Sequence, residues 1–374
     1  MHKINTGVLT FWNVPNYGTY AQAYALQKVV EQCLPDSEVK QIAYLKKKHY
    51  EFYYSKFPQT SMFGRSFYRN LFKYLIPTSP YNKRRNMFLN EYKKIPHTEE
   101  MDSTRLSEVV FDNLILGSDI IWDYSFEVFD NDSYLFGQHI ISTNKIAYAA
   151  SFGTVQKEWS HPQYVMDGIK KLNAISVRDE NSANIVEKLT GVRPKVVLDP
   201  TWLWDFEKDP NVVSPKYKDY IVVYGQDFTD IFIDEIIEYA KENHYNLICL
   251  DCNDDNYDWC DVVIKQYDLT PLEWVGYFRD AKAIATSTYH GLTFGLIFSK
   301  KMAFCRSDFI IAKASSFLKE LGLYELYNAR GRSAKEMLNF QTNNENIQKY
   351  IQHKRKESKE FLLDAINVRG VENE

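Results

Sequence analysis

Short apolar runs alternate with helical patterns along most of this chain, and the alternation constrains the fold more than any other feature. In the first half, runs typical of buried strands recur at residues 4–12, 39–45, 114–116, 146–150, 174–177 and 196–198. Helical spacing lies between several of them, for example at 180–189. Strands that alternate with helices form parallel sheets with crossover helices, so the sequence predicts an α/β fold.

The alternation starts again after a polar, proline-containing stretch at 204–218. Strand-like runs follow at 220–224, 246–250, 261–264 and 282–286. A chain of 374 residues is also too long for one ordinary core. We therefore predict two Rossmann-like, doubly wound domains with a central cleft, at 1–205 and 206–338, and a helical C-terminal tail at 339–374. Ligands are expected at the carboxyl ends of the strands.

A basic, aromatic insert interrupts the first predicted domain at about 46–105. Its densest part, 46–94, has twelve lysines and arginines against two acids, with tyrosines and phenylalanines interleaved. Such a segment suits the surface of an anionic bilayer. It equally suits a solvated helical subdomain with its aromatics in a local core. Nucleic acid is not predicted as a partner, because the net charge of −4 gives no general reason for it.

The sequence predicts a cytoplasmic protein, with peripheral contact at the inner face of the membrane through the insert. No signal peptide is visible, and no apolar run approaches 18 residues. The five cysteines indicate reduced thiols. Cys249, Cys252 and Cys260 offer three metal ligands, but no second CxxC accompanies them. We therefore expect structural thiols and no metal site.

Two turn segments at strand ends in the first half carry candidate site residues. The first leads from a strand into a helix, and Gly18 permits close approach of the backbone there. In the second, Asp119 is a candidate general base, and Trp122 offers a ring that can stack on a sugar. A plain turn and a helix N-cap at Asp119 are the competing interpretations. The candidate binding residues of the two segments are Asn16, Tyr17, Gly18, Ser118 and Trp122.

Three further segments follow predicted strands. Ser151 lies among small residues that suit close approach to a ligand or a neighbouring helix. Arg178 can bind a carboxylate or phosphate, or pair with a nearby acid, for which Asp179, Glu180 and Asp199 are the candidates. The last segment opens a helix, whose N-terminus can hold an anion while His290 donates to it or moves a proton. The residues of this segment are Ser287, Thr288, Tyr289, His290 and Gly291.

Together these segments offer a cation, a histidine, an acid and helix N-termini, a set that suits a small polyanionic substrate. The chain has no P-loop, GxGxxG, HExxH or GxSxG motif, so the chemistries tied to those motifs lose support.

The segments also resemble those of the bacterial polysaccharide pyruvyl transferases. The similar stretches occur in order over roughly the first 300 residues and are specific as a set. They are NYGTYAQAYALQ at 16–27, LGSDIIW at 116–122, YAASFG at 148–153, ISVRDENSA at 175–183, VLDPTWL at 197–203 and STYHGLTFGLIFSKK at 287–301. The insert and the C-terminal tail lie outside the resemblance.

The resemblance implies a fold similar to GT-B glycosyltransferases and a specific reaction. Pyruvate would pass from phosphoenolpyruvate to two hydroxyls of one sugar, giving a ketal and free phosphate, with no cofactor. By resemblance, Arg178 and His290 are associated with the donor, and Asp119 matches the acid of the "GSD" segment. Some members of the family carry an arginine where this chain has Thr288. A second donor-binding cation must then come from elsewhere, and the candidates are Lys301, Arg306, Arg330 and Arg332.

In this chemistry, Asp119 is expected to act as base for the sugar hydroxyl, and His290 as acid or phosphate partner. The expected partners are phosphoenolpyruvate and a sugar or lipid-linked oligosaccharide acceptor, the precursor of a bacterial surface polysaccharide. Two alternatives stay open at this point. One is a nucleotide-sugar glycosyltransferase on the same GT-B-like fold, and the other is a carbohydrate-binding protein without catalysis.

Overall fold

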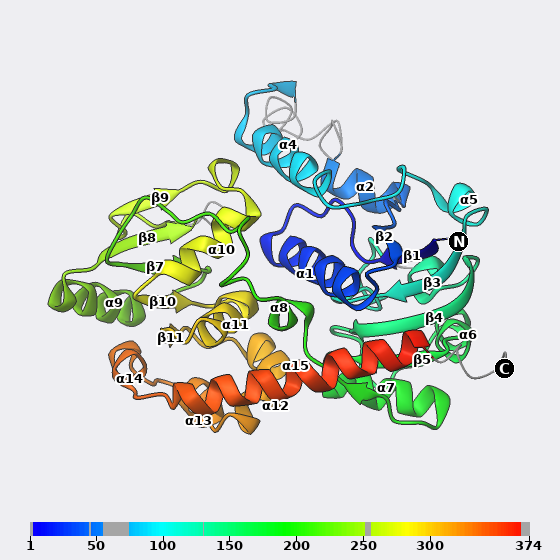
Figure 1. Cartoon of the computed structure of the whole chain (residues 1–374). Coiled ribbons are helices and arrows are strands. Elements are labelled where there is room, and N and C mark those ends of the chain that lie inside the picture. The colour runs from blue at the N-terminus through cyan, green and yellow to red at the C-terminus, as the bar shows by residue number, and fades with distance from the viewer. Residues whose placement is uncertain (1–2, 45, 55–74, 130, 251–255, 368–374) are drawn as a thin grey trace. The chain divides into compact units, whose positions relative to one another are not determined.

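The computed structural model describes residues 3–44, 46–54, 75–129, 131–250 and 256–367. It divides into two compact units, of which the first comprises 1–204 with 354–374 and the second comprises 205–353. Each unit contains one sheet of parallel strands with helices around it (Figure 1). The predicted α/β fold with two doubly wound units is confirmed.

The first sheet has six strands in the order β2-β1-β3-β4-β5-β6. The chain moves from β1 to one side for β2 and later to the other side for β3, so the topological switch point lies between β1 and β3. Ligands of such sheets bind outside the carboxyl ends of the two strands at this point. The strands are β1 (Ile4–Leu9), β2 (Ser37–Gln41), β3 (Val110–Leu116), β4 (Ile141–Ala150), β5 (Ala174–Val177) and β6 (Lys195–Val196).

The second sheet has five strands in the order β11-β10-β7-β8-β9, which places its switch point between β7 and β10. The strands are β7 (Tyr220–Tyr224), β8 (Asn246–Leu250), β9 (Val262–Ile264), β10 (Ala283–Thr286) and β11 (Lys301–Phe304). Their register is regular along β7, β8 and β10, which pair residue by residue.

The helices of the first unit are α1 (Tyr17–Cys33), α2 (Lys47–Tyr54), α4 (Pro80–Tyr92), α5 (Ser103–Leu106), α6 (Gln163–Lys170), α7 (Glu180–Thr190) and α8 (Pro200–Leu203), with a 3₁₀ turn η1 (Ser133–Phe136). Those of the second unit are α9 (Asp230–Asn243), α10 (Pro271–Asp280), α11 (Tyr289–Ile297), α12 (Asp308–Glu320), α13 (Tyr324–Asn328) and α14 (Ala334–Asn339), with η2 (Gln266–Asp268). The last helix, α15 (Asn344–Asn367), contributes to both.

Both sheets are buried on two faces, which explains why their strands read as continuous apolar runs. Leu9 and Leu114 in the first sheet, and Val222 and Ile284 in the second, are fully buried. Helix α1 begins at Tyr17, so the turn after β1 is shorter than the sequence pattern predicts.

The described part of the insert is folded and packs on α1 (Figure 1). Ring centroids of Tyr17 and Phe88 lie 5.2 Å apart, and those of Tyr20 and Tyr92 lie 5.1 Å apart. Arg84 Nη2 donates a 2.5 Å hydrogen bond to the Pro15 carbonyl in the loop before α1. Phe88 and Tyr92 on α4 thus belong to the core of the first unit. The rest of the insert, 55–74, lies outside the described residues.

Helix α15 is anchored in each unit by side-chain contacts. In the first unit, Ser358 Oγ accepts a 3.1 Å hydrogen bond from the Leu198 amide. In the second, Gln348 Nε2 donates a 3.1 Å hydrogen bond to the Ile297 carbonyl. None of the helices in the described parts of the chain has the length and apolar character needed to cross a bilayer.

Candidate functional site

The first cluster of candidate residues lies at the switch point of the first sheet. Asn16, in the loop after β1, caps α1 by accepting a 3.1 Å hydrogen bond from the Thr19 amide. Asp119 follows β3 with its backbone in the left-handed region, at φ 73°. Thr19 Oγ1 donates a 3.1 Å hydrogen bond to Asp119 Oδ2. The carboxylate of Asp119 therefore joins the loop after β3 to the first turn of α1, and it caps none of the described helices.

Asp119 is the most accessible member of a buried ion cluster. Arg178, directly after β5, places Nη1 2.9 Å from Asp199 Oδ2 and 3.5 Å from Asp119 Oδ1. The side chains are 11% exposed for Asp119, 7% for Arg178 and 0% for Asp199. The pair with Asp199, one of the two sequence interpretations of Arg178, is thus present. One guanidinium between two carboxylates leaves the cluster with a net negative charge and fixes the orientation of the Asp119 carboxylate.

The insert contributes charged and ionisable groups to the same region. Burial raises the pKa of Tyr53 on α2 to about 12, and the negative charge of Asp119 contributes to this rise. The positive charge of Arg84 on α4 opposes it. Both residues are therefore close enough to the cluster to interact with it electrostatically. The sequence assigned neither of them, nor Thr19, to the site. Thr19 carries a signal in hindsight, since it falls within the stretch that resembles the family.

Ser118 and Ser151, predicted to bind substrate, are committed to contacts inside the fold. Ser118 is fully buried, and its Oγ donates a 2.6 Å hydrogen bond to Gln22 Oε1. Ser151 is 1% exposed, and its Oγ donates a 2.6 Å hydrogen bond to Asp179 Oδ2, the cap of α7. These two hydroxyls satisfy buried acceptors, and a buried acceptor that loses its donor lowers the folding stability by about 1–3 kcal/mol. They are therefore engaged in the fold and are not available to a substrate.

The predicted sugar-stacking role of Trp122 is wrong, because its ring is fully buried. The ring packs against Phe136 and Phe152 at centroid distances of 5.8 and 5.2 Å, and Nε1 donates a 3.0 Å hydrogen bond to the Leu135 carbonyl. An aromatic residue beside a candidate acid carries no signal that separates a core ring from an exposed one.

Of the three candidates in the turn after β1, Asn16 alone is exposed. Tyr17 is 4% exposed with its ring against Phe88, and Gly18 is buried within α1. Asn16 is therefore the accessible candidate of this segment, and the other two serve packing.

The second cluster lies at the switch point of the other sheet, and its predicted strand–turn–helix arrangement is confirmed. Thr288 caps α11 directly after β10, accepting a 3.0 Å hydrogen bond from the Gly291 amide. Ser287 Oγ donates to the Gln226 carbonyl at 2.9 Å and accepts from the Gln226 amide at 3.0 Å. Ser287 thus ties the loop after β10 to the loop after β7. The sequence did not single out Gln226.

His290 and its neighbours occupy the first turn of α11. His290 is half-buried, and its ring centroid lies 5.3 Å from that of Tyr289 in an edge-on arrangement. Gly291 has a packing reason to be glycine, because a Cβ there would lie 2.1 Å from Thr286 Oγ1. A direct role of Gly291 in binding is therefore not needed to explain its identity.

A cavity of about 470 Å³ lies at this switch point, at the carboxyl ends of three strands. Its size is within the range typical of small-molecule sites. It is lined by Gln226 and Asp227 after β7, by Ser287 and Thr288 after β10, and by Cys305 and Arg306 after β11, among others. Tyr289, His290 and Gly291 do not line it.

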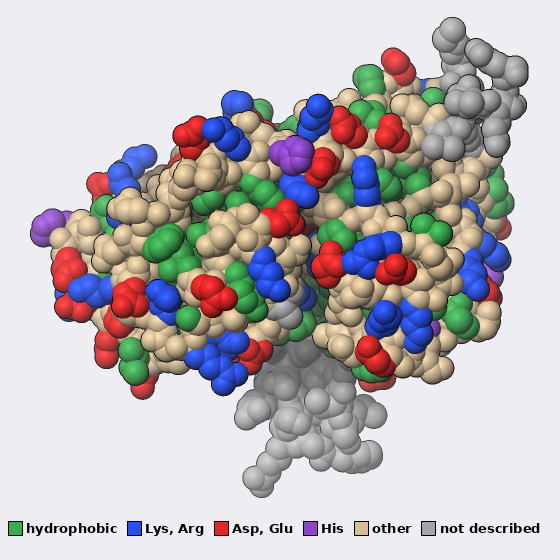
Figure 2. Space-filling view, turned by 90° about the horizontal axis from the view of Figure 1, so that it is seen from below, with side chains coloured by type: hydrophobic (Ala, Val, Ile, Leu, Met, Phe, Trp, Pro, Cys, Tyr) green, Lys and Arg blue, Asp and Glu red, His purple; other side chains and the backbone are tan. Residues whose placement is uncertain are grey.

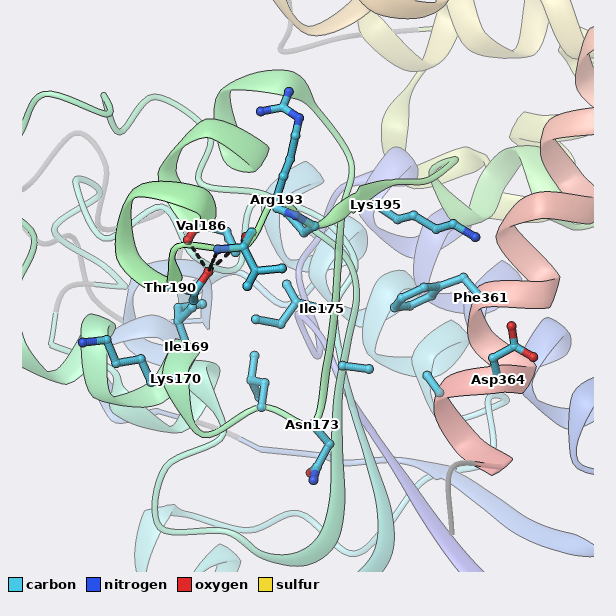
Figure 3. Close-up of a pocket in the computed structure, with 15 residues that line it drawn as sticks. Ile169, Lys170, Asn173, Ile175, Val186, Thr190, Arg193, Lys195, Phe361 and Asp364 are labelled. Atoms are coloured by element: carbon cyan, nitrogen blue, oxygen red, sulfur yellow. Dashed lines mark hydrogen bonds between the residues drawn. The ribbon is translucent and has the colours of Figure 1, made fainter. Parts of the chain in front are cut away.

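The described residues also enclose two larger cavities. One, of about 670 Å³, sits at the amino ends of β5 and β6, where Ile175, Val186 and Phe361 give it an apolar lining (Figure 3). The other, of about 600 Å³, lies in the second unit and shares Cys305 and Arg306 with the switch-point cavity. On the face shown in Figure 2, basic and acidic side chains are interspersed and form no extended patch of one sign. An anion that binds this face would therefore depend on individual basic side chains.

The described residues contain no group of three His, Cys, Asp or Glu side chains suited to a metal ion. Cys249 and Cys260 form no disulfide with a described residue, whereas Cys252 lies outside the part of the chain that the structure describes.

Comparison with protein families gives a match to the polysaccharide pyruvyl transferase model over residues 16–308. No curated protein matches the chain. Among solved structures, the UDP-GlcNAc 2-epimerase of Methanocaldococcus jannaschii is 12% identical with a TM-score of 0.46, covering 94% of this chain and 99% of its own. The heptosyltransferase WaaC of E. coli is 10% identical with a TM-score of 0.39, covering 87% and 100%. The glycosyltransferase SnogD of Streptomyces nogalater is 11% identical with a TM-score of 0.38, covering 97% and 100%. Likenesses this distant carry no conclusion about substrate.

Proposed function

The chain belongs to the polysaccharide pyruvyl transferase family, and we propose that it moves pyruvate from phosphoenolpyruvate to two hydroxyls of one sugar. The product is a cyclic ketal on a bacterial surface polysaccharide or its lipid-linked precursor, and phosphate is released. The observation that carries the proposal is Asp119, an oriented carboxylate at the switch point of the first sheet, in a chain of this family.

The reaction needs proton transfers at two kinds of atom. A proton adds to the methylene carbon of phosphoenolpyruvate, and the adjacent carbon becomes oxocarbenium-like. A sugar hydroxyl attacks that carbon. The bond between the carbon and the phosphate oxygen then breaks, phosphate leaves with the bonding electrons, and the second hydroxyl attacks the same carbon to close the ring. Two hydroxyl protons are lost in total, one balanced by the new methyl C–H bond and the other by the departing phosphate. A general base is therefore required at the hydroxyls.

Asp119 is our candidate for that base. Its Oδ2 accepts from Thr19, and its Oδ1 faces both Arg178 and the Ile120 amide, so the carboxylate has one orientation. Preorganisation of this kind holds a catalytic group in productive geometry without a reorganisation cost during the reaction. Arg178 then acts as a positioning residue for Asp119, a role that differs from the donor contact implied by the family resemblance.

His290 is our candidate for the acid or for a partner of the leaving phosphate. It lies in the first turn of α11, where the N-terminal end of the helix dipole favours a negatively charged group. The switch-point cavity of the second unit is the corresponding candidate for the donor pocket.

The test is phosphate release in the presence of phosphoenolpyruvate and a panel of sugars with two free hydroxyls. We expect release that requires both substrates, with a pyruvate ketal on the sugar by mass spectrometry. Turnover with a nucleotide sugar, and none with phosphoenolpyruvate, would favour the glycosyltransferase alternative. Absence of turnover with either donor would favour a binding protein.

We further propose peripheral contact with an anionic membrane through α2, where a lipid-linked acceptor is met. Tyr50 and Phe52 on this helix are 39% and 51% exposed, next to the exposed Lys47 and Lys48. Exposed aromatics beside lysines are the combination that binds the interface of an anionic bilayer.

A further inference from the structure

The switch-point cavity of the second unit contains one arginine, and the sequence left its role open. Four cations, Lys301, Arg306, Arg330 and Arg332, are candidates for a second donor contact. Lys301 begins β11 and therefore lies at the opposite, amino edge of the sheet, with Nζ 3.4 Å from the Tyr239 hydroxyl. Arg330 and Arg332 line the neighbouring 600 Å³ cavity. Arg306 alone of the four lines the cavity together with Ser287 and Thr288.

The guanidinium of Arg306 is held from one side. Its Nε donates a 2.7 Å hydrogen bond to the carbonyl of Asn328, the last residue of α13, and Nη2 lies 3.2 Å from Asn328 Oδ1. Nη1 makes no hydrogen bond to any residue that the structure describes. Because the guanidinium of Arg306 is fixed through Nε and Nη2, the two N–H donors of Nη1 stay available for an anion. Binding an anion there would cost little side-chain entropy, since the side chain is already ordered.

The competing carboxylate is weakly placed. Arg306 also forms an ion pair with Asp308, whose side chain is 72% exposed. Exposed pairs of this kind contribute little stability, because water screens them. Asp308 lines the neighbouring cavity and not this one, whose lining acid, Asp227, forms no ion pair with Arg306 in the described part of the chain. An anion in the switch-point cavity can therefore share the guanidinium without displacing a buried partner.

The situation of Arg178 is the opposite, since its side chain is 7% exposed and bridges two carboxylates. An anion could bind Arg178 only by leaving Asp119 or Asp199 uncompensated in a buried place. Removing one partner of a buried pair is far more costly than adding a ligand to an exposed one.

We propose that Arg306 is the cation of the switch-point cavity that binds the carboxylate or phosphate of a small anionic substrate, phosphoenolpyruvate in the proposed function on which this inference rests. The cavity receives this cation from the segment after β11, whereas this chain has Thr288 at the position where some family members carry an arginine. Arg306 thus replaces a cation that the loop after β10 lacks.

The experiment measures binding of phosphoenolpyruvate, pyruvate and inorganic phosphate by calorimetry. The proteins are the wild type, Arg306→Gln, and Arg332→Gln as a matched control from the neighbouring cavity. We expect Arg306→Gln to bind phosphoenolpyruvate about 10- to 150-fold more weakly, the usual range for a lost charge-assisted hydrogen bond. The control should stay within twofold. Loss for pyruvate alone would assign Arg306 to the carboxylate, and loss for phosphate alone to the phosphate.

Arg306→Gln also loses contacts to Asn328, so a second measurement uses the unmodified protein. Phenylglyoxal modifies accessible arginines, and phosphoenolpyruvate should slow the modification of Arg306 more than that of Arg332. Binding by Arg306→Gln within threefold of wild type, or modification of Arg306 that no anion slows, would overturn the assignment. Wild-type binding of phosphate through Arg306, without binding of phosphoenolpyruvate, would instead retain the anion site and remove the proposed pyruvyl transfer.

Discussion

Replacing Arg178 with alanine should destabilise the first unit strongly, because Arg178 is the common partner of two poorly exposed carboxylates. Its Nη1 lies 2.9 Å from Asp199 Oδ2, and the Asp199 side chain is fully buried. Without the guanidinium, Asp199 keeps its hydrogen bonds from the Thr201 amide and hydroxyl, at 3.0 and 2.7 Å, but loses its positive partner. The same substitution removes the nearest cation from Asp119.

The magnitude follows from burial. Removing one partner of a buried ion pair costs about 3–5 kcal/mol, since the remaining charge stays out of water. For a unit of this size, each kcal/mol lowers the melting temperature by about 2–4 °C, so the midpoint should fall by about 6–20 °C. The matched control is Arg193→Ala. Arg193 also contacts two carboxylates, those of Glu180 and Glu187, but its side chain is 43% exposed. Its loss should cost about 1 kcal/mol or less.

Differential scanning calorimetry at pH 7 measures both variants and can resolve separate transitions of the two units. A double variant, Arg178→Ala with Asp199→Asn, removes the uncompensated charge while the asparagine still caps α8. The double variant should be more stable than Arg178→Ala alone. If the two changes acted independently, their effects would add and the double variant would be the less stable one. The reasoning is refuted if Arg178→Ala loses no more stability than Arg193→Ala, or if the double variant is the less stable one.

Three further predictions concern catalysis, pH and membranes. Asp119→Asn should keep the melting temperature and donor binding but lose about 10²–10⁴-fold in phosphate release, and unfolding of this variant would make Asp119 structural. Burial, followed by the positive charge of Lys46, lowers the pKa of His49 to about 4, compared with about 6.5 in the unfolded chain. Between these two values the unfolded state binds a proton that the folded state does not, so the stability falls as the pH drops from about 6.5 towards 4. Unfolding in urea at pH 7 and pH 5 should show a loss of roughly 2 kcal/mol from this group that His49→Phe abolishes, and equal acid sensitivity of the two proteins would contradict it. Flotation with anionic vesicles should show salt-sensitive binding that Phe52→Ser together with Lys47→Glu weakens, and binding unaffected by either salt or these changes would exclude contact through α2.

Much of the fold was predictable because parallel strands covered on both faces leave a strong apolar signal. The restart of the alternation after 204–218 predicted the second unit, and the segment 287–291, between an apolar run and an apolar helical stretch, predicted the turn and helix N-terminus at α11. The sequence pattern indicates a turn through Gly18, whereas α1 begins at Tyr17. Asn16 is a good N-cap residue, but Gly18 two residues later reads as a turn, and tertiary packing of Tyr17 decides in favour of the helix.

Which side chains face a ligand was far less predictable, because exposure depends on partners that are distant in sequence. Ser118 and Ser151 are small and polar in the right loops, yet each satisfies a buried acceptor from another segment. The insert shows the same limit for charge. Arg84 reads as part of a basic surface, but its guanidinium donates to Pro15 in the first unit. A run of basic residues does not reveal which of them turn inward.

The charges of the two switch points support different substrates within the proposed reaction. The cluster around Asp119 has one guanidinium and two carboxylates, so its field disfavours an anion and suits a neutral hydroxyl that must lose a proton. The cavity of the second unit is lined by one acid, Asp227, but also by Arg306 with unused donors and by Thr288, the N-cap of α11, and these two favour an anion. If phosphoenolpyruvate is the donor, its carboxylate and phosphate therefore belong with Arg306, and the sugar hydroxyl belongs with Asp119. In this proposal Arg178, the first cation that the sequence suggests as a donor contact, orients Asp119 instead.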